Sequence, residues 1–360
     1  MTTRFSRLRR APFAALGLVA VSALALSACS SSADAEPAAT DEATSDYVWT
    51  MVTDQAGLGD QGFNDLAKLG IDMSAEELGG EAQVLQSSDQ SQYVTNLQQA
   101  IQTGSTVTTG VGYLLADAMV EVAQANPDSL FTLIDSEALD ADGNPLDNVA
   151  GVIYKEQEAS FLAGIVAGMT TETDTIGFVG GMEIPAVLRF YSGFVAGVES
   201  VNPDATVTAA YVGSFGDSAK GKELALGFYD QGADIVMEVA GGSGIGVFDA
   251  ASELGTGNWV VSTDTCKIDL APENFLTSAV KDVAGTVLRE NTAAVEGTFV
   301  GGTVQLGLAD GGVGLCQDNI DDLSADIVSV VDEATTAIID GSLVPPATPE
   351  ELETFTAPAL

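Results

Sequence analysis

The most constraining feature of this sequence is a rhythm of short apolar runs and longer helical patterns that occurs twice. The first occurrence comprises expected strands and helices at 48–52, 65–78, 82–85, 91–101, 106–109, 116–124 and 130–134. The second comprises those at 175–179, 185–200, 206–211, 235–239, 247–254 and 259–262. Strands that alternate with helices form βαβ units and parallel sheets. The sequence therefore predicts an α/β fold with two doubly wound, Rossmann-like halves.

The two halves also share a glycine turn and a carboxylate at matching places. In the first half Gly110 lies 25 residues before Asp135, and in the second Gly241 lies 23 residues before Asp264. Each pair is expected at the carboxyl ends of neighbouring strands, where open α/β sheets bind ligands. Two such edges that face each other predict a binding cleft between two lobes.

The N-terminal segment predicts export and lipidation. Four arginines within the first ten residues precede an apolar run at 12–26, which is too short to cross a bilayer. The run ends in Leu26-Ser27-Ala28-Cys29, which resembles the lipobox of bacterial lipoproteins. We expect a signal peptide at 1–28, acylation of Cys29 and a flexible tether at 29–46, since that stretch has almost no large apolar side chain.

Charge narrows the range of partners. The chain carries 12 basic and 52 acidic side chains, a net charge of −40, and four of the basic ones lie in the signal peptide. Such a surface repels nucleic acid and phosphates. A neutral or cationic small ligand fits it better. The acidity is equally compatible with adaptation to high salt.

The numbers of histidines and cysteines limit the catalytic chemistry that the chain can perform and indicate whether a disulfide can form. The chain has no histidine, which removes the commonest general base and every Ser-His or Cys-His pair. We therefore expect no enzyme. Cys266 and Cys316 remain once Cys29 is assigned to lipid, and an even pair outside the cytoplasm favours a disulfide, with two free thiols as the alternative.

Two motifs allow other interpretations. Gly242, Gly244 and Gly246 after a strand, with Asp264 about twenty residues on, partly match a dinucleotide fingerprint. Their spacing departs from that fingerprint, and an exported protein has little access to NAD, so we expect no cofactor. The carboxylates of Asp54, Asp60 and Asp65 lack calcium-loop spacing, so they are interpreted as caps and turn formers, and no metal is expected.

Two aromatic residues occupy loops at strand ends. Phe63 follows a glycine-containing loop in the first half, and Phe215 lies between two glycines in the second. An aromatic at such a place commonly packs into the core. Alternatively, one ring from each half could enclose a flat ligand.

Several segments, taken in order, resemble the basic membrane protein family of substrate-binding lipoproteins. They are Asp60–Asn64, Gly180–Pro185, Arg189–Val198, Gly213–Phe215, Ala240–Gly244, Asp264 and Ser278–Lys281. They span nearly the whole chain beyond the tether. One departure is Gly62, where the family usually has serine.

The resemblance implies a role for each matched residue. Phe63 and Phe215 would stack on the two faces of a nucleoside base, and Asn64 and Asp135 would bond its polar edge. The ribose hydroxyls would then be held by the remaining matched groups, Gly241 or Gly242, Asp264 and Lys281. Apart from the resemblance, Cys266 lies two residues past Asp264, where a bridge to Cys316 would fix the loop on the ribose side.

The family fold is the type I periplasmic-binding-protein architecture, two lobes joined by a hinge. The expected boundaries are 47–154 for lobe 1, 155–272 for lobe 2, 273–302 for a return to lobe 1, and 303–360 for a recrossing to lobe 2 and the C-terminal tail, with a helix at 277–295. The implied function is capture of a purine nucleoside by hinge closure for an ABC permease, by a monomer lipid-anchored on the outer face of the cell membrane. The alternative is a sugar or signalling ligand in the same fold.

Overall fold

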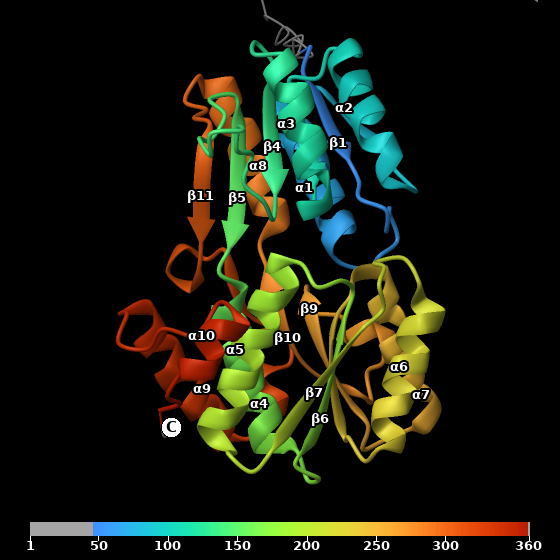
Figure 1. Cartoon of the computed structure of the whole chain (residues 1–360), viewed down its shortest axis with the longest axis vertical. Helices are drawn as coiled ribbons and strands as arrows, with labels where there is room; N and C mark the ends of the chain where they lie inside the picture. The colour runs from blue at the N-terminus through green and yellow to red at the C-terminus, as the bar shows by residue number, and fades with distance from the viewer. Residues whose placement is uncertain (1–45, 359–360) are drawn as a thin grey trace, which may run out of the picture. The chain divides into compact units, whose positions relative to one another are not determined.

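The structure is a computed structural model that describes residues 46–358. Its strands form two six-stranded sheets (Figure 1). The first sheet has the order β11 (Gly302–Leu306), β5 (Val149–Tyr154), β4 (Leu130–Ile134), β3 (Val107–Val111), β1 (Val48–Val52) and β2 (Glu81–Leu85). The second has the order β12 (Val313–Leu315), β10 (Phe275–Lys281), β9 (Trp259–Asp264), β8 (Ile235–Val239), β6 (Thr175–Gly180) and β7 (Thr206–Tyr211). Every neighbouring pair is parallel except β10 and β12.

Helices cover both faces of each sheet, as parallel strands require. Around the first sheet lie α1 (Phe63–Leu78), α2 (Tyr93–Gln102), α3 (Ala116–Ala125) and α8 (Val283–Glu296). Around the second lie α4 (Glu156–Thr170), α5 (Pro185–Val201), α6 (Ser218–Asp230), α7 (Ile245–Leu254), α9 (Ala325–Ile339) and α10 (Pro349–Thr354). Short 3₁₀ turns occur at Gln90–Gln92, Tyr113–Leu115, Gly241–Gly244, Ile268–Leu270, Leu308–Asp310 and Ile320–Asp322. We call each sheet with its helices the first and the second lobe.

Burial follows the position of each strand. The inner strands β3 and β8 are buried along their whole length, whereas the edge strands β2 and β7 are partly exposed. In the second lobe α4 and α5 pack at very short range, because a Cβ on Gly197 would lie 2.0 Å from the carbonyl oxygen of Phe161. This contact fixes α5, whose N-terminal end borders the cleft described below.

The chain passes between the lobes at three places, after β5, after β10 and after β11 (Figure 1). This corrects two expectations. The helix expected at 277–295 is strand β10 followed by α8, so the return to the first lobe begins after Lys281 and not at 273. Strand β11 lies in the first sheet, beside β5, so recrossing begins after Leu306 and not at 303. Asp282 marks the true helix start, since its carboxylate accepts a hydrogen bond from Gly285 N at 3.0 Å.

Candidate functional site

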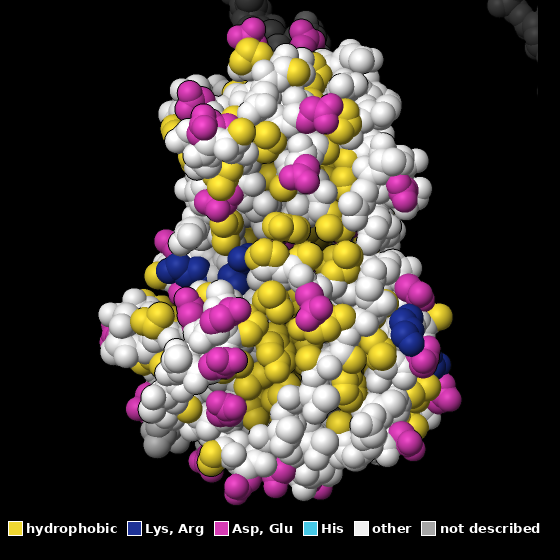
Figure 2. All heavy atoms as spheres, viewed as in Figure 1, with side chains coloured by type: hydrophobic (Ala, Val, Ile, Leu, Met, Phe, Trp, Pro, Cys, Tyr) yellow, Lys and Arg dark blue, Asp and Glu magenta, His cyan; other side chains and the backbone are white. Residues whose placement is uncertain are grey.

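A cleft lies where the carboxyl ends of the two sheets face each other. Its walls are formed by residues from both lobes: Asp54, Ala56, Asp60, Phe63, Asn64, Gly112, Tyr113, Leu114, Asp135, Ile184, Ala186, Val187, Phe190, Phe215, Val239, Ala240, Gly241, Thr263, Asp264 and Lys281. Strand ends of open α/β sheets are the usual ligand sites of such folds. In Figure 2, apolar side chains gather along the line where the lobes meet, and acidic ones are scattered over both lobes.

The loop between β1 and α1 positions an amide in the first-lobe wall. The Asp60 carboxylate accepts hydrogen bonds from the backbone N–H groups of Gly62 and Asn64, at 3.0 and 2.8 Å, and thereby caps α1. Asn64 Nδ2 donates to Asp54 Oδ1 and to Asp60 Oδ2, both at 2.9 Å. Asn64 Oδ1 is buried without a hydrogen-bond partner. The side chain therefore offers a fixed acceptor at the cleft wall.

The two carboxylates beside this amide have raised pKa values. Burial raises the pKa of Asp54 to about 6, although hydrogen bonds from Asn64 and Ala56 oppose the shift. Burial also raises the pKa of Asp60, again against the hydrogen bonds of Asn64. Both carboxylates accept hydrogen bonds from the Asn64 amide. This part of the cleft is therefore rich in acceptors and suits a ligand edge that donates.

The two expected aromatic rings come from different lobes. Phe63 is the first residue of α1, and Phe215 lies in the loop between β7 and α6. Both side chains are only partly buried, and among the described residues the two rings do not contact each other. The Phe215 ring lies against Gly181, where a Cβ would be 2.3 Å from its Cε1 atom. Each ring thus contributes an accessible face to the cleft.

Two aspartates occupy equivalent left-handed positions at the strand ends. Asp135 follows β4 with φ of 66°, and Asp264 ends β9 with φ of 69°. Gly112 and Gly241, each 23 residues earlier, also have positive φ. The first-half counterpart of Gly241 is therefore Gly112 and not Gly110, which lies inside β3. Left-handed aspartates are uncommon, and such strain is concentrated at functional sites.

Lys281 joins these aspartates across the lobes. Its Nζ lies 2.7 Å from Asp135 Oδ2, 3.7 Å from Asp264 Oδ1 and 3.7 Å from Glu156 Oε1. It also lies 4.5 Å from the centre of the Phe63 ring. Burial alone would lower the pKa of Lys281, but the three carboxylates outweigh it and raise that pKa. Lys281 is therefore a buried cation that connects β10 of the second lobe to β4 of the first.

A second ion pair lies beneath this network. Arg189 Nε on α5 donates to Glu156 Oε2 at 2.5 Å, and the Glu156 side chain is fully buried. Glu156 follows the first crossing and Lys281 precedes the second. Two of the charged residues at the cleft, Glu156 and Lys281, therefore lie directly beside the chain segments that cross between the lobes.

Seven of the eight expected ligand-binding residues lie in the cleft wall, and Gly242 does not. Gly242 faces the loop of Phe215, since a Cβ there would lie 3.2 Å from the carbonyl oxygen of Phe215. Sequence reasoning did not assign a site role to Asp54 or Asp60. The sequence feature that could have indicated this role is the presence of both acids, Asp54 and Asp60, in the same glycine-rich loop as Asn64.

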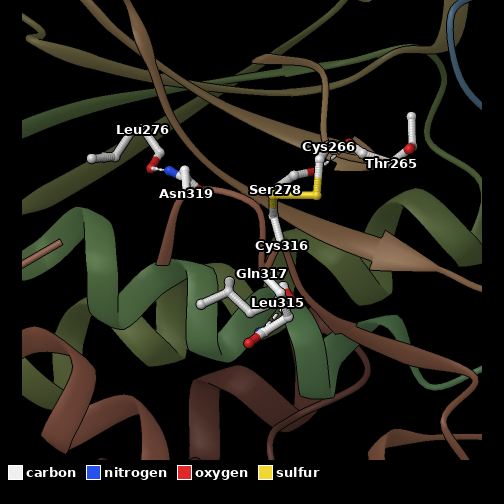
Figure 3. Close-up of a disulfide and its surroundings, with 8 residues drawn as sticks. All are labelled: Thr265, Cys266, Leu276, Ser278, Leu315, Cys316, Gln317 and Asn319. Carbon is white, nitrogen blue, oxygen red and sulfur yellow. Dashed lines mark hydrogen bonds between the residues drawn. A yellow bond between two sulfur atoms is a disulfide. The ribbon is translucent and has the colours of Figure 1, made fainter. Parts of the chain in front are cut away.

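Cys266 and Cys316 are joined by a disulfide (Figure 3). It connects the segment after β9 to the end of β12, and Ser278 Oγ donates to Thr265 O at 2.8 Å beside it. In the described part of the chain, these cysteines and Asp318 form the one group of three or more possible metal ligands. Because the two sulfurs are bonded to each other, this group offers no thiolate to a metal.

Cys29 lies outside the described residues, as do the expected signal peptide and nearly all of the expected tether. Within residues 46–358, no helix has the length and apolar character needed to cross a membrane.

Two doubly wound lobes, joined by three crossings around a cleft, define a two-lobed binding protein of the periplasmic-binding-protein type. A crystal structure of ABC transporter system solute-binding proteins from Aeropyrum pernix K1 has a TM-score of 0.78 and 28% identity, and covers 86% of this chain and 96% of its own. A solute-binding protein from Conexibacter woesei has a TM-score of 0.62 and 26% identity over 84% of this chain and 99% of its own.

Residues 48–347 match the Bmp family, described as ABC transporter substrate-binding protein PnrA-like. The chain belongs to this family, whose members are substrate-binding proteins of ABC transporters and not enzymes. It is 36% identical to the ABC transporter nucleoside-binding protein BmpA of Lactococcus lactis subsp. cremoris, over 82% of this chain and 88% of that protein. It is 34% identical to a CD4+ T-cell-stimulating antigen of Listeria innocua, over 93% of this chain and 98% of that protein.

Proposed function

We propose that this protein binds a purine nucleoside in the cleft and delivers it to an ABC permease. The observation that carries the proposal is the pair of half-buried rings, Phe63 and Phe215, contributed by opposite lobes beside the unpartnered acceptor of Asn64. A flat base fits between two aromatic faces, and each stacked face contributes about 1 to 3 kcal/mol. The relative from Lactococcus lactis named as nucleoside-binding supports the same ligand class.

The first-lobe wall favours bases whose polar edge donates. Asn64 Nδ2 is engaged by two carboxylates, so its Oδ1 faces the ligand as an acceptor. Asp54 Oδ1 already accepts from Asn64 and Ala56, which leaves Oδ2 for a ligand. Guanine and hypoxanthine present an N1–H donor at this edge, and guanine adds an amino group. Adenine presents N1 as an acceptor, so we expect guanosine and inosine to bind more tightly than adenosine.

The ribose belongs on the opposite side of the proposed site. Asp264 supplies a carboxylate acceptor, Lys281 a cation, and the turn at Gly241 a close approach of backbone. A sugar diol can donate to the carboxylate and accept from the ammonium group at once. Asp135 shares Lys281 with Asp264 and completes this side from the first lobe.

Hinge closure is the proposed mode of capture. The ligand would contact both walls only when the lobes are closed, so binding shifts the equilibrium toward the closed state. The moving bodies would be the two lobes, and the hinge the three crossings after β5, β10 and β11. X-ray scattering in solution should show a smaller radius of gyration with guanosine than without it.

Attachment to the outer face of the cell membrane is proposed to occur through lipid on Cys29, with the 29–46 segment as tether. We also propose that the protein acts as a monomer. Mass spectrometry of the protein from membranes should show a diacylated Cys29 as the first residue, and Cys29→Ala should release the protein from the membrane fraction.

The test of the ligand is titration calorimetry of the purified protein with guanosine, inosine, adenosine, cytidine, ribose and NAD. We expect one-to-one binding of purine nucleosides, with guanosine and inosine tightest and ribose weak. Binding of ribose alone, or of none of these compounds, would overturn the nucleoside proposal and favour a sugar or signalling ligand.

A further inference from the structure

A second buried cation, Lys267, lies beside the cleft. It belongs to the segment Asp264–Lys267 at the end of β9, which we call the arm. Its side chain is 3% exposed, and its Nζ lies 2.8 Å from Glu238 Oε1. Glu238 is fully buried and also accepts from Ser262 Oγ at 2.8 Å. Burial alone would lower the pKa of Lys267, but Glu238, Asp264 and Asp60 raise it. Lys267 is therefore a buried cation in this structure.

The arm is held firmly to the second lobe. Asp264 ends β9 in its left-handed conformation, Thr265 O accepts from Ser278, and Cys266 is bonded to Cys316 (Figure 3). Lys267 then points back to Glu238 under the glycine turn. With these anchors in succession, Lys267 has little freedom to move away from the cleft.

The first lobe lies directly against this cation. A Cβ on Gly62 would lie 3.2 Å from both Cε and Nζ of Lys267 and 3.3 Å from Asp264 Oδ2. These distances are shorter than ordinary contacts of a side chain, and Lys267 could yield only by leaving Glu238. The absence of a side chain at Gly62 thus lets the helix-capping loop approach Lys267. The same loop carries Asp60, whose carboxylate acts on Lys267 through space.

We propose that Lys267 is a positioning residue with two roles. It favours closure of the lobes by receiving the first-lobe loop at Gly62, and it holds Asp264 in place for the ligand. Its ligand-binding part rests on the proposed nucleoside function, whereas its effect on closure does not. The attraction between Lys267 and Asp60 acts between lobes, and it exists only when Gly62 is seated on the arm. The pair Lys267–Glu238, by contrast, lies within the second lobe and persists in any arrangement of the two lobes.

This difference provides the test. Lys267→Met leaves Glu238 buried without its counterion, so it should lower the melting temperature as well as the affinity. The double variant Glu238→Gln, Lys267→Met removes both charges, which should restore most of the stability. We expect the double variant to bind guanosine at least tenfold more weakly than the parent. Lys222→Met, which removes a surface lysine paired with Glu253, should leave the affinity unchanged.

Two readouts separate the outcomes. If the double variant regains both stability and affinity, Lys267 only neutralises Glu238 and the proposal is wrong. X-ray scattering without ligand tests closure independently, and the double variant should have a larger radius of gyration than the parent. If the parent binds no nucleoside, the proposed function fails and scattering alone decides the role of Lys267. An unchanged radius would then overturn that role.

Discussion

The two walls of the cleft use the same strand-end geometry but differ in charge. The first lobe contributes Asp54, Asp60 and Asp135, all acidic. All the cations at or beneath the cleft that the structure describes come from the second lobe: Arg189, Lys267 and Lys281. In a protein of net charge −40 basic side chains are few, so their concentration on the second-lobe side of the cleft distinguishes the two walls. Each of these cations also has a carboxylate partner in the second lobe, Glu156, Glu238 or Asp264, so an acidic wall faces a wall in which both charges are paired.

The substitution expected to have the largest effect on this charge arrangement is Lys281→Met. The change leaves Asp135, Asp264 and Glu156 buried without their shared cation, which should destabilise the protein by about 3 to 5 kcal/mol. Guanosine affinity should fall at least a hundredfold. Denaturant unfolding and calorimetry measure the two effects. Lys222→Met is the matched control, and equal stabilities of the two variants would contradict the counterion role.

Removal of one aromatic face tests the part of the cleft that does not depend on charge. Phe215→Ala should weaken guanosine binding more than tenfold, since loss of one stacked face costs about 1 to 3 kcal/mol. The ring is only partly buried, so the melting temperature should change little. Phe299→Ala removes a partly buried ring outside the cleft wall and should leave the affinity unchanged. Unaltered binding by Phe215→Ala would remove this ring from the site.

A lower pH should weaken the preference of the first-lobe wall for guanosine over adenosine. The pKa of Asp54 is about 6 because the group is buried, so between about pH 7.5 and about pH 5.5 it changes from carboxylate to acid. The acid can donate to N1 of adenine but no longer accepts well from guanine. The ratio of adenosine to guanosine affinity should therefore rise as the pH falls through 6. Asp54→Asn should bind with the same ratio at both pH values, and calorimetry would show a persisting shift if another group were responsible.

Salt should produce the smallest effect and act on the whole surface instead of the cleft. Added sodium chloride screens repulsion among the excess carboxylates, so the melting temperature should rise by about 2 °C or more between about 0.1 M and about 1 M salt. Guanosine is neutral, so its affinity should change less than threefold. A falling melting temperature would argue against both self-repulsion and adaptation to high salt.

Local patterns predicted most of the first and second sheets. The apolar runs at 48–52, 130–134, 206–211 and 235–239 are the strands β1, β4, β7 and β8 with the same bounds. The error after residue 273 has a physical cause. Alanine and lysine in the segment Ser278–Lys281 are compatible with a helix, but the segment lies in strand β10 and the helix begins only after its cap, Asp282. Strand pairing beside β9 determines the structure there, and a local pattern does not contain it.

The polar contacts of the cleft were less accessible to sequence reasoning. Asp135 and Lys281 were both assigned to the ligand, but their contact with each other joins positions 146 residues apart. The burial of Lys267 could not be predicted from the sequence, because a single lysine in a loop resembles any solvated one. Its burial depends on Glu238 and Gly62, which come from a different strand and a different lobe. Motifs therefore located the cleft, while its ion pairs required the tertiary structure.

The position of β11 has a consequence for how the protein is made. The edge of the first sheet is formed by Gly302–Leu306, and α8, which covers one of its faces, precedes it by only a few residues. During synthesis the N-terminal part emerges first, yet its sheet lacks an edge strand and a covering helix until Leu306 has been added. The first sheet is therefore completed late, although β12, α9 and α10 of the second lobe come later still, and a chain interrupted before β11 leaves β5 as an open edge exposed to aggregation.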